Sequence, residues 1–335
     1  MQSVLTRTDS HTIPFSELRM GKYVLLRQLG QGGSATIYLA EQISCKSQVA
    51  LKLLNRWRAS QQEVERFQFE ASLLAQLQHR HIVPILDFGW EQGTPYLVME
   101  YAPGGTLQSA FPQGVPLPVQ SILPIVLQLA SALQYVHDHR VIHSDVKPEN
   151  VLLGRNNRIW LADFGIATMV PSVLEKRYGK REVKGTARYM APEQIRGNPM
   201  PASDQYALAV MVYEWLCGRP PFHGSVLGVH VGHVSTPPPA LRDHVSSISP
   251  AVEHIVLKSL SKDPQRRFAQ VMDFASALKQ ATARKMSQGI PSATCRGAFS
   301  QAEPWFLSAG ANTTHDTNSR SNTPLRPKTA KLCVL

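Results

Sequence analysis

A polar cluster near the middle of the chain constrains its fold more than any other feature. The stretch HSDVKPEN occupies 143–150, and Asp163-Phe164-Gly165 follows shortly after it. Mg²⁺ prefers oxygen ligands, which Asn150 and Asp163 can supply. Asp145 can accept the proton of a hydroxyl, and Lys147 can add positive charge beside a transferred phosphoryl group. Each aspartate alone could equally be a turn or capping residue. Four such groups at this spacing, together with a glycine loop, Lys52 and Glu70 upstream in order, indicate phosphoryl transfer.

A glycine-rich stretch lies upstream, GQGGSA at 30–35, between predicted strands at 23–29 and 35–40. Glycines allow the backbone to close over phosphate oxygens and to offer N–H donors. A dinucleotide-binding fingerprint needs a helix directly after the glycines, and strand residues follow here, which excludes that class of site. A hairpin turn without a ligand remains an alternative for this stretch alone.

Lys52 lies in the middle of a third predicted strand, VALKLL at 49–54. A buried ammonium is unfavourable unless it is paired. Glu70 is its natural partner, on a predicted helix at 63–78 whose apolar residues follow helical spacing. The alternative places Lys52 on an edge strand facing solvent. Further along, 126–139 predicts a long helix with one apolar face and with Pro124 in its first turn.

Composition divides the 335 residues into four parts. We expect a polar lead at 1–22, a strand-rich part at 23–101, a helix-rich part at 102–283, and a disordered basic tail rich in Ser, Thr and Pro at 284–335. The four cysteines form no C-x-x-C pair, which favours a reducing compartment and argues against a structural zinc site.

The net charge of +11 raises nucleic acid, membranes and acidic substrates as partners. The positive charge forms no single stripe, and basic and aromatic residues do not cluster together, so we expect no nucleic-acid partner. The longest apolar run, at 207–213, is far shorter than the roughly 20 residues that span a bilayer. We therefore expect a cytoplasmic protein without a membrane span.

Taken together, the motifs resemble a Ser/Thr protein kinase of the eukaryotic-like bacterial type, over about 23–281. The resemblance implies an α+β, bilobal fold, with a small β-rich N-lobe at 23–101 and a larger helical C-lobe at 102–283. Its matched series, highly specific as an ordered set, is GQGGSATI, VALK with Glu70, HSDVKPEN, DFG, Gly185-Thr186, Ala191-Pro192-Glu193, Ser203-Asp204 and Asp263-Pro264-Gln265-Arg266-Arg267.

The resemblance also implies roles for individual residues. Lys52 should hold the α- and β-phosphates of ATP while paired with Glu70. Asn150 and Asp163 should bind Mg²⁺ or Mn²⁺, and Asp145 should be the catalytic base. The implied lining of the nucleotide site is Leu29, Gly30, Gly32, Gly33, Ile37, Ala50, Met99, Glu100, Ala102 and Leu152. Within that set, Met99 falls at the gatekeeper position and 100–102 form the hinge that meets adenine.

Other matched residues indicate the subclass and the internal supports. Lys147 is typical of Ser/Thr rather than Tyr kinases, and Thr186 should bridge it to the base. Arg267 should pair with Glu193, and Asp204 should tie the catalytic loop to a buried helix. We also expect His143 to pack against Phe164. Finally, His233-Val234, leading into three prolines, is similar to bacterial members of the family.

Two positions depart from the family pattern. Ala35 stands where a third glycine is usual, and we expect only a modest effect on the glycine loop. Ser144 stands where most relatives carry an arginine that pairs with a phosphorylated activation loop, and serine cannot make that ion pair. Either the loop needs no phosphate or activity is low; we favour the first. The basic loop at 171–184 could attract acidic substrates or simply be a solvated surface.

The expected function is ATP-dependent phosphorylation of Ser and Thr hydroxyls on proteins, this chain included. One alternative is a weakly active kinase or a pseudokinase that acts as a nucleotide-binding scaffold. The presence of Lys52, Asp145 and Asp163 argues against it. A second alternative, a small-molecule phosphotransferase, matches the segment from Gly185 to Glu193 less well.

Overall fold

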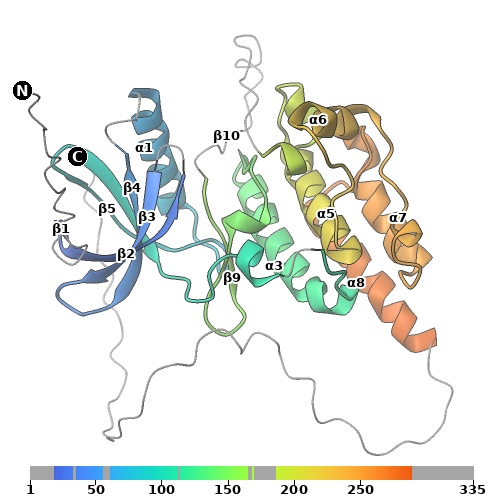
Figure 1. Ribbon diagram of the computed structural model, residues 1–335, viewed down its shortest axis with the longest axis horizontal. Helices are drawn as coiled ribbons and strands as arrows, with labels where there is room; N and C mark the ends of the chain where they lie inside the picture. Colours follow the sequence, from blue (N-terminus) through green and yellow to red (C-terminus); the bar gives the residue numbers. More distant parts are fainter. Residues whose placement is uncertain are drawn as a thin grey trace, which may run out of the picture. The chain divides into compact units, whose positions relative to one another are not determined.

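The computed structural model describes residues 19–32, 35–55, 61–111, 114–164, 168–169 and 186–288. Its N-terminal part is an antiparallel sheet of six strands with one helix, α1 (Gln61–Gln76), beside it (Figure 1). The strands, in their spatial order, are β1 (Arg19–Met20), β2 (Tyr23–Gln31), β3 (Ala35–Gln42), β4 (Gln48–Leu54), β6 (Thr94–Glu100) and β5 (Ile85–Glu91). The strands and the helix predicted for this region are confirmed, with ends shifted by up to two residues.

The two faces of this sheet are covered differently, because side chains alternate along a strand. On β4, Leu51 belongs to a small apolar cluster on one face, with Leu25 and Val98. Ala50 and Leu54 belong to the main core, which also includes the α1 residues Phe67 and Leu74. Lys52 lies between Ala50 and Leu54 in this alternation, so it points to the face that α1 covers.

The C-terminal part is mainly helical (Figure 1). Its helices are α2 (Leu107–Ala110), α3 (Val119–Asp138), α4 (Pro192–Ile195), α5 (Pro201–Cys217), α6 (Val226–Ser235), α7 (Pro250–Ser259) and α8 (Val271–Gln288). Four short strands accompany them: β7 (Val141–Ile142), β8 (Val151–Leu153), β9 (Ile159–Leu161) and β10 (Thr168–Met169). Helix α5 is buried on nearly every side from Ser203 onward, which is typical of a central core helix.

The predicted start of helix α3 is wrong. The helix begins at Val119, so Pro124 is its sixth residue and lies inside the helix, not in its first turn. Proline lacks the N–H that would bond to the carbonyl of Gln120. Both residues are exposed, so water can satisfy that carbonyl and the helix continues. Among the described helices, α3 is also long and apolar enough to cross a membrane, a test that core helices pass as well.

A buried ion pair fastens the segment before α5 to the loop before α8. Arg267 donates from Nη1 and Nη2 to the two carboxylate oxygens of Glu193, each at 2.8 Å. Ser203 Oγ donates to Glu193 Oε1 at 2.7 Å, and Arg267 Nη1 donates to the Ala202 carbonyl at 2.7 Å. The expected pairing of Arg267 with Glu193 is confirmed. Glu193, Ser203 and Arg267 are buried, so removing either charge of the ion pair would leave the other charge buried without a partner.

Replacing Arg267 with alanine should lower the free energy of unfolding by about 3–5 kcal/mol, because the Glu193 carboxylate would remain buried without its partner. The preceding residue provides a matched control. The Arg266 side chain is 81% exposed and lies 3.7 Å from Asp263, so Arg266→Ala should leave stability unchanged. Thermal or urea unfolding measures both variants. Equal stability of the two would contradict the structural role of Arg267.

Candidate active site

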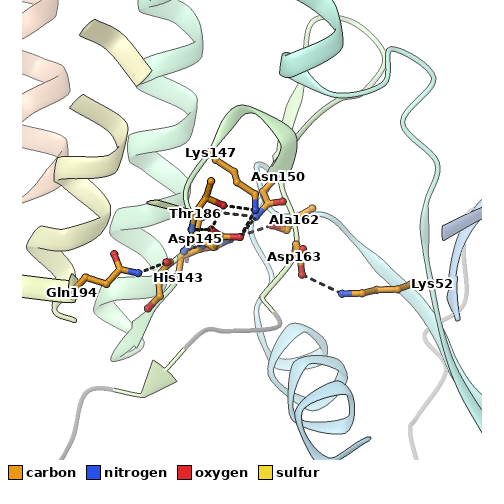
Figure 2. Close-up of polar contacts among 10 residues, drawn as sticks. Lys52, His143, Asp145, Lys147, Asn150, Ala162, Asp163, Thr186 and Gln194 are labelled. Atoms are coloured by element: carbon orange, nitrogen blue, oxygen red, sulfur yellow. Dashed lines mark hydrogen bonds and ion pairs between the residues drawn. The ribbon is translucent and has the colours of Figure 1, made fainter. Parts of the chain in front are cut away.

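Side chains from four separate parts of the chain converge on one site (Figure 2). Lys52 comes from β4, and Asp145, Lys147 and Asn150 come from the loop between β7 and β8. Asp163 follows β9, and Thr186 begins the segment that leads to α4. The structure therefore brings together polar residues that are more than a hundred positions apart.

Lys52 is held between two carboxylates. Its Nζ donates to Glu70 Oε2 at 2.7 Å and to Oε1 at 2.9 Å, and it lies 3.2 Å from Asp163 Oδ1. The Lys52 and Glu70 side chains are 12% and 3% exposed, whereas Asp163 is 50% exposed. The edge-strand alternative for Lys52 is thus wrong, and the accessible carboxylate is that of Asp163.

The surroundings determine the charge state of this pair. Burial alone would lower the pKa of the Lys52 ammonium, but the carboxylates of Glu70 and Asp163 outweigh it and raise the pKa above its ordinary value. Burial raises the pKa of the Glu70 carboxyl, and the facing ammonium opposes that rise. A lysine with a raised pKa keeps its proton at neutral pH, so a positive charge is permanently fixed beside Asp163.

Asp145 is the centre of a second group of contacts. Lys147 Nζ lies 2.6 Å from Asp145 Oδ2 and donates to Thr186 Oγ1 at 2.8 Å. Thr186 donates to Asp145 Oδ1 from both its backbone N and its Oγ1, each at 3.1 Å. The expected bridge by Thr186 between Asp145 and Lys147 is confirmed (Figure 2). A hydroxyl arriving here would meet an aspartate whose orientation is already fixed.

Asn150 supports the same aspartate and leaves one atom suited to a cation. Its Nδ2 donates to the Asp145 backbone carbonyl at 2.9 Å and to Asp145 Oδ2 at 3.1 Å. Since the amide nitrogen is engaged, the amide oxygen is the atom that could ligate a metal. Asp163 has a backbone φ of 63°, an uncommon conformation that is often found at functional sites. The donor set of one carboxylate and one amide oxygen suits a hard divalent cation.

A buried carboxylate on α5 holds the loop that carries Asp145. Asp204 Oδ2 accepts from the backbone N of His143 at 2.9 Å, and Oδ1 accepts from that of Ser144 at 2.8 Å. His143 in turn meets the ring of Phe164, with 4.6 Å between centroids. The expectations for Asp204 and His143 are both confirmed. The loop position is therefore set by α5, the most deeply buried helix.

Several of the residues expected to line a nucleotide lie in the main core or against it. Ala50, Met99 and Ala102 are buried core residues, and Ile37 and Leu152 pack against that core. Ala50 and Met99 are direct partners on β4 and β6. Leu29 and Glu100 are exposed, on β2 and at the end of β6. Gly30 lies within β2, where it pairs with Ile37 of β3, and Gly32 follows the end of that strand.

Several expectations lie outside the described residues. They concern Gly33, Gly165, Gly185, the basic loop at 171–184 and the part of the expected tail from 289 onward. The first five residues of that expected tail, 284–288, are instead helical and form the end of α8. Within the described ranges, histidine, cysteine and carboxylate side chains form no group of three or more that could hold a metal ion. A cation at Asn150 and Asp163 would therefore need further oxygen ligands from a bound molecule.

Some contacts around this site have no signature in the sequence. Gln194 Nε2 donates to the backbone carbonyl of Ser144 at 2.6 Å. Tyr189 donates from its hydroxyl to Glu214 Oε2 at 3.0 Å, and Arg188 forms an ion pair with the same carboxylate. No local pattern marks these residues, because their partners lie 25 or more positions away in the chain.

Comparisons with known proteins agree with this geometry. The protein kinase domain family matches residues 23–281. The chain is 37% identical over 264 residues to the serine/threonine-protein kinase PrkC of Bacillus subtilis, covering 78% of this chain and 40% of that protein. It is 38% identical over 269 residues to the serine/threonine-protein kinase PknF of Mycobacterium tuberculosis, and the match covers 76% of this chain and 55% of that protein. The chain thus spans roughly half the length of these relatives.

Proposed function

Because this chain belongs to the protein kinase family, we propose that it is an ATP-dependent kinase that phosphorylates Ser and Thr hydroxyls of proteins, its own included. The family in general uses ATP and a divalent metal. The relatives compared above are named serine/threonine-protein kinases. The observation that carries the proposal is that two groups of contacts meet at the site. Lys52 forms ion pairs with the carboxylates of Glu70 and Asp163. Asp145 is contacted by Lys147, Asn150 and Thr186.

Each residue has a defined task in this proposal. Lys52 binds the α- and β-phosphates, and Glu70 fixes the direction of its ammonium. Asp163 and the amide oxygen of Asn150 hold Mg²⁺, which would neutralise charge on the phosphate oxygens. Magnesium sites often use one or two protein ligands plus substrate phosphates, which fits the small donor set here.

Asp145 is the residue that acts on the acceptor hydroxyl. Its carboxylate accepts the proton of the attacking hydroxyl, and Thr186 and Lys147 keep it aimed. Lys147 also places a positive charge beside the transferred phosphoryl group. The lining proposed for adenine is the apolar cluster of Ile37, Ala50 and Leu152 together with Met99 and Ala102. The proposed nucleotide site also includes the other residues expected to line it, which are Leu29, Gly30, Gly32, Gly33 and Glu100.

We further propose that the division expected from composition holds, with an N-lobe at 23–101 and a C-lobe at 102–283. The lead at 1–22 and the tail at 284–335 would flank this catalytic unit. The partners would be ATP and proteins with Ser or Thr acceptors.

Asp145→Asn should lower kcat for phosphotransfer by about 10²–10⁴-fold, since it removes the general base, while the KM for ATP stays close to wild type. Asp163→Ala should abolish metal-dependent turnover, because it removes the carboxylate proposed to hold the cation. Transfer from γ-labelled ATP to a generic protein acceptor, with mapping of the modified residues, measures both. Asp273→Asn, an exposed acid on α8, is the control and should match wild type. Comparable turnover in Asp145→Asn would disprove its assignment.

The residue before Asp145 leads to a separate prediction about regulation. Ser144 is 7% exposed, its backbone φ is 67°, and its hydroxyl is buried with no hydrogen-bond partner. A serine offers no cation for a phosphate on the activation loop. We therefore propose that the enzyme reaches its active shape without such a phosphate.

Alanine at Thr168 or Ser172, or phenylalanine at Tyr178, should each leave most of the activity, as should prior phosphatase treatment. Thr186 is excluded from this series because its hydroxyl contacts Asp145. Initial rates on a protein acceptor, with mass spectrometry to confirm the phosphorylation state, provide the measurement. An inactive dephosphorylated enzyme that recovers on rephosphorylation of one loop residue would contradict the proposal.

A further inference from the structure

A fully buried histidine lies on the inner side of α6, outside the site described above. His233 has an exposed fraction of 0%. Its Nδ1 lies 2.9 Å from the hydroxyl of Tyr206 on α5, and its Nε2 lies 3.0 Å from the backbone carbonyl oxygen of Arg188. The ring of Phe222 meets it edge-on, with 5.0 Å between centroids. Both ring nitrogens are therefore engaged, each by a different part of the chain.

The partners determine where the proton of His233 lies. A backbone carbonyl can only accept, so Nε2 must carry the hydrogen and donate it to Arg188. Nδ1 is then the acceptor for the Tyr206 hydroxyl. Burial lowers the pKa of His233 to about 4, and the nearby Lys262 ammonium acts in the same direction. The ring is thus neutral at physiological pH, in the tautomer that this arrangement requires.

The depth of His233 is set by its neighbour Gly232. A Cβ on Gly232 would lie 2.7 Å from Cγ of Phe222, so only glycine permits this approach of α6. Lys262 Nζ donates to the Gly232 carbonyl at 2.9 Å and lies 4.5 Å from the centre of the Phe222 ring. These contacts fix the position of the end of α6, and therefore the position of His233.

The accepting carbonyl belongs to a segment that reaches the catalytic aspartate. Arg188 lies in a single 3₁₀ turn, Ala187–Tyr189, directly after Thr186. Thr186 contacts Asp145 Oδ1, while Tyr189 and Arg188 reach Glu214 on α5 through their side chains. His233 supplies the contact with α6, and it does so through the backbone. A backbone contact fixes the path of the segment whatever side chains the segment carries.

We propose that His233 is a positioning residue for the protein acceptor, which it serves by fixing the segment 186–193 through the Arg188 carbonyl. This inference rests on the proposed function, in which Asp145 receives the acceptor hydroxyl. The segment begins at Thr186, which contacts Asp145, so its displacement would disturb the acceptor side of the site. Lys52 and Asp163 have no contact with His233 among the hydrogen bonds of the described residues. Loss of the histidine should therefore disturb the acceptor and leave nucleotide binding intact.

Three variants of the full chain test this proposal. In His233→Leu, the Arg188 carbonyl loses its donor, so KM for a protein acceptor should rise about tenfold. KM for ATP and the rate of ATP hydrolysis without acceptor should stay at wild-type values. His233→Gln can still present an N–H near Arg188 and should restore most of the acceptor KM. His230→Leu is the matched control on the same helix, because His230 Nε2 has no hydrogen-bond partner, and it should match wild type.

Hydrogen–deuterium exchange provides a readout that does not require activity. The backbone N–H groups of Tyr189 and Met190 bond within the turn, to Thr186 and Ala187. They should exchange faster in His233→Leu than in wild type or His230→Leu. An unchanged acceptor KM with unchanged exchange, or an equal rise in both KM values, would overturn the proposal. If wild type phosphorylates no acceptor at all, the proposed function fails, while the exchange data still decide whether His233 holds the segment.

Discussion

A lysine ammonium held between two carboxylates is the interaction on which the site depends. A lone charge in the interior would be strongly unfavourable, so Lys52 can be buried on β4 only if α1 presents Glu70 to it. The same ammonium reaches Asp163, which follows β9. One interaction therefore relates a strand, a helix and a loop that are distant in sequence. In this position a positive charge and an accessible carboxylate face a common space, as phosphate and metal binding require.

The second half of the site rests on the helical part of the chain. The buried carboxylate of Asp204 on α5 accepts two backbone N–H groups of the loop before Asp145. The Glu193–Arg267 pair fastens the segment before α5, and His233 on α6 reaches the turn after Thr186. Each of these contacts joins a buried side chain to the backbone or charge of a loop. The loops that carry the chemistry are thus positioned by rigid helices, which is how a preoriented base can be maintained.

Much of this arrangement could be predicted from sequence, for identifiable reasons. The strand alternation around Lys52 and the helical spacing around Glu70 are local patterns, and the ordered motifs supplied the pairs Arg267–Glu193 and Thr186–Asp145. The start of α3 was predicted wrongly, because Pro124 suggests a boundary while exposure makes its missing hydrogen bond tolerable. The contacts of His233 and Glu214 could not be predicted, since they depend on how α5 and α6 pack against a distant turn. The roles assigned to the nucleotide-lining residues remain predictions.

A double-mutant cycle on Lys52 and Glu70 tests the central claim most directly, with the free energy of unfolding as the measured quantity. Lys52→Met should destabilise the protein by about 3–5 kcal/mol, because it leaves the Glu70 carboxylate buried without its partner. Glu70→Leu should cost less, because Asp163 remains 3.2 Å from the Lys52 ammonium. The double variant should recover most of the Lys52→Met loss, since no unpaired charge remains, although phosphotransfer would stay absent. Losses that simply add in the double variant would show that the two charges do not depend on each other, and would contradict this account.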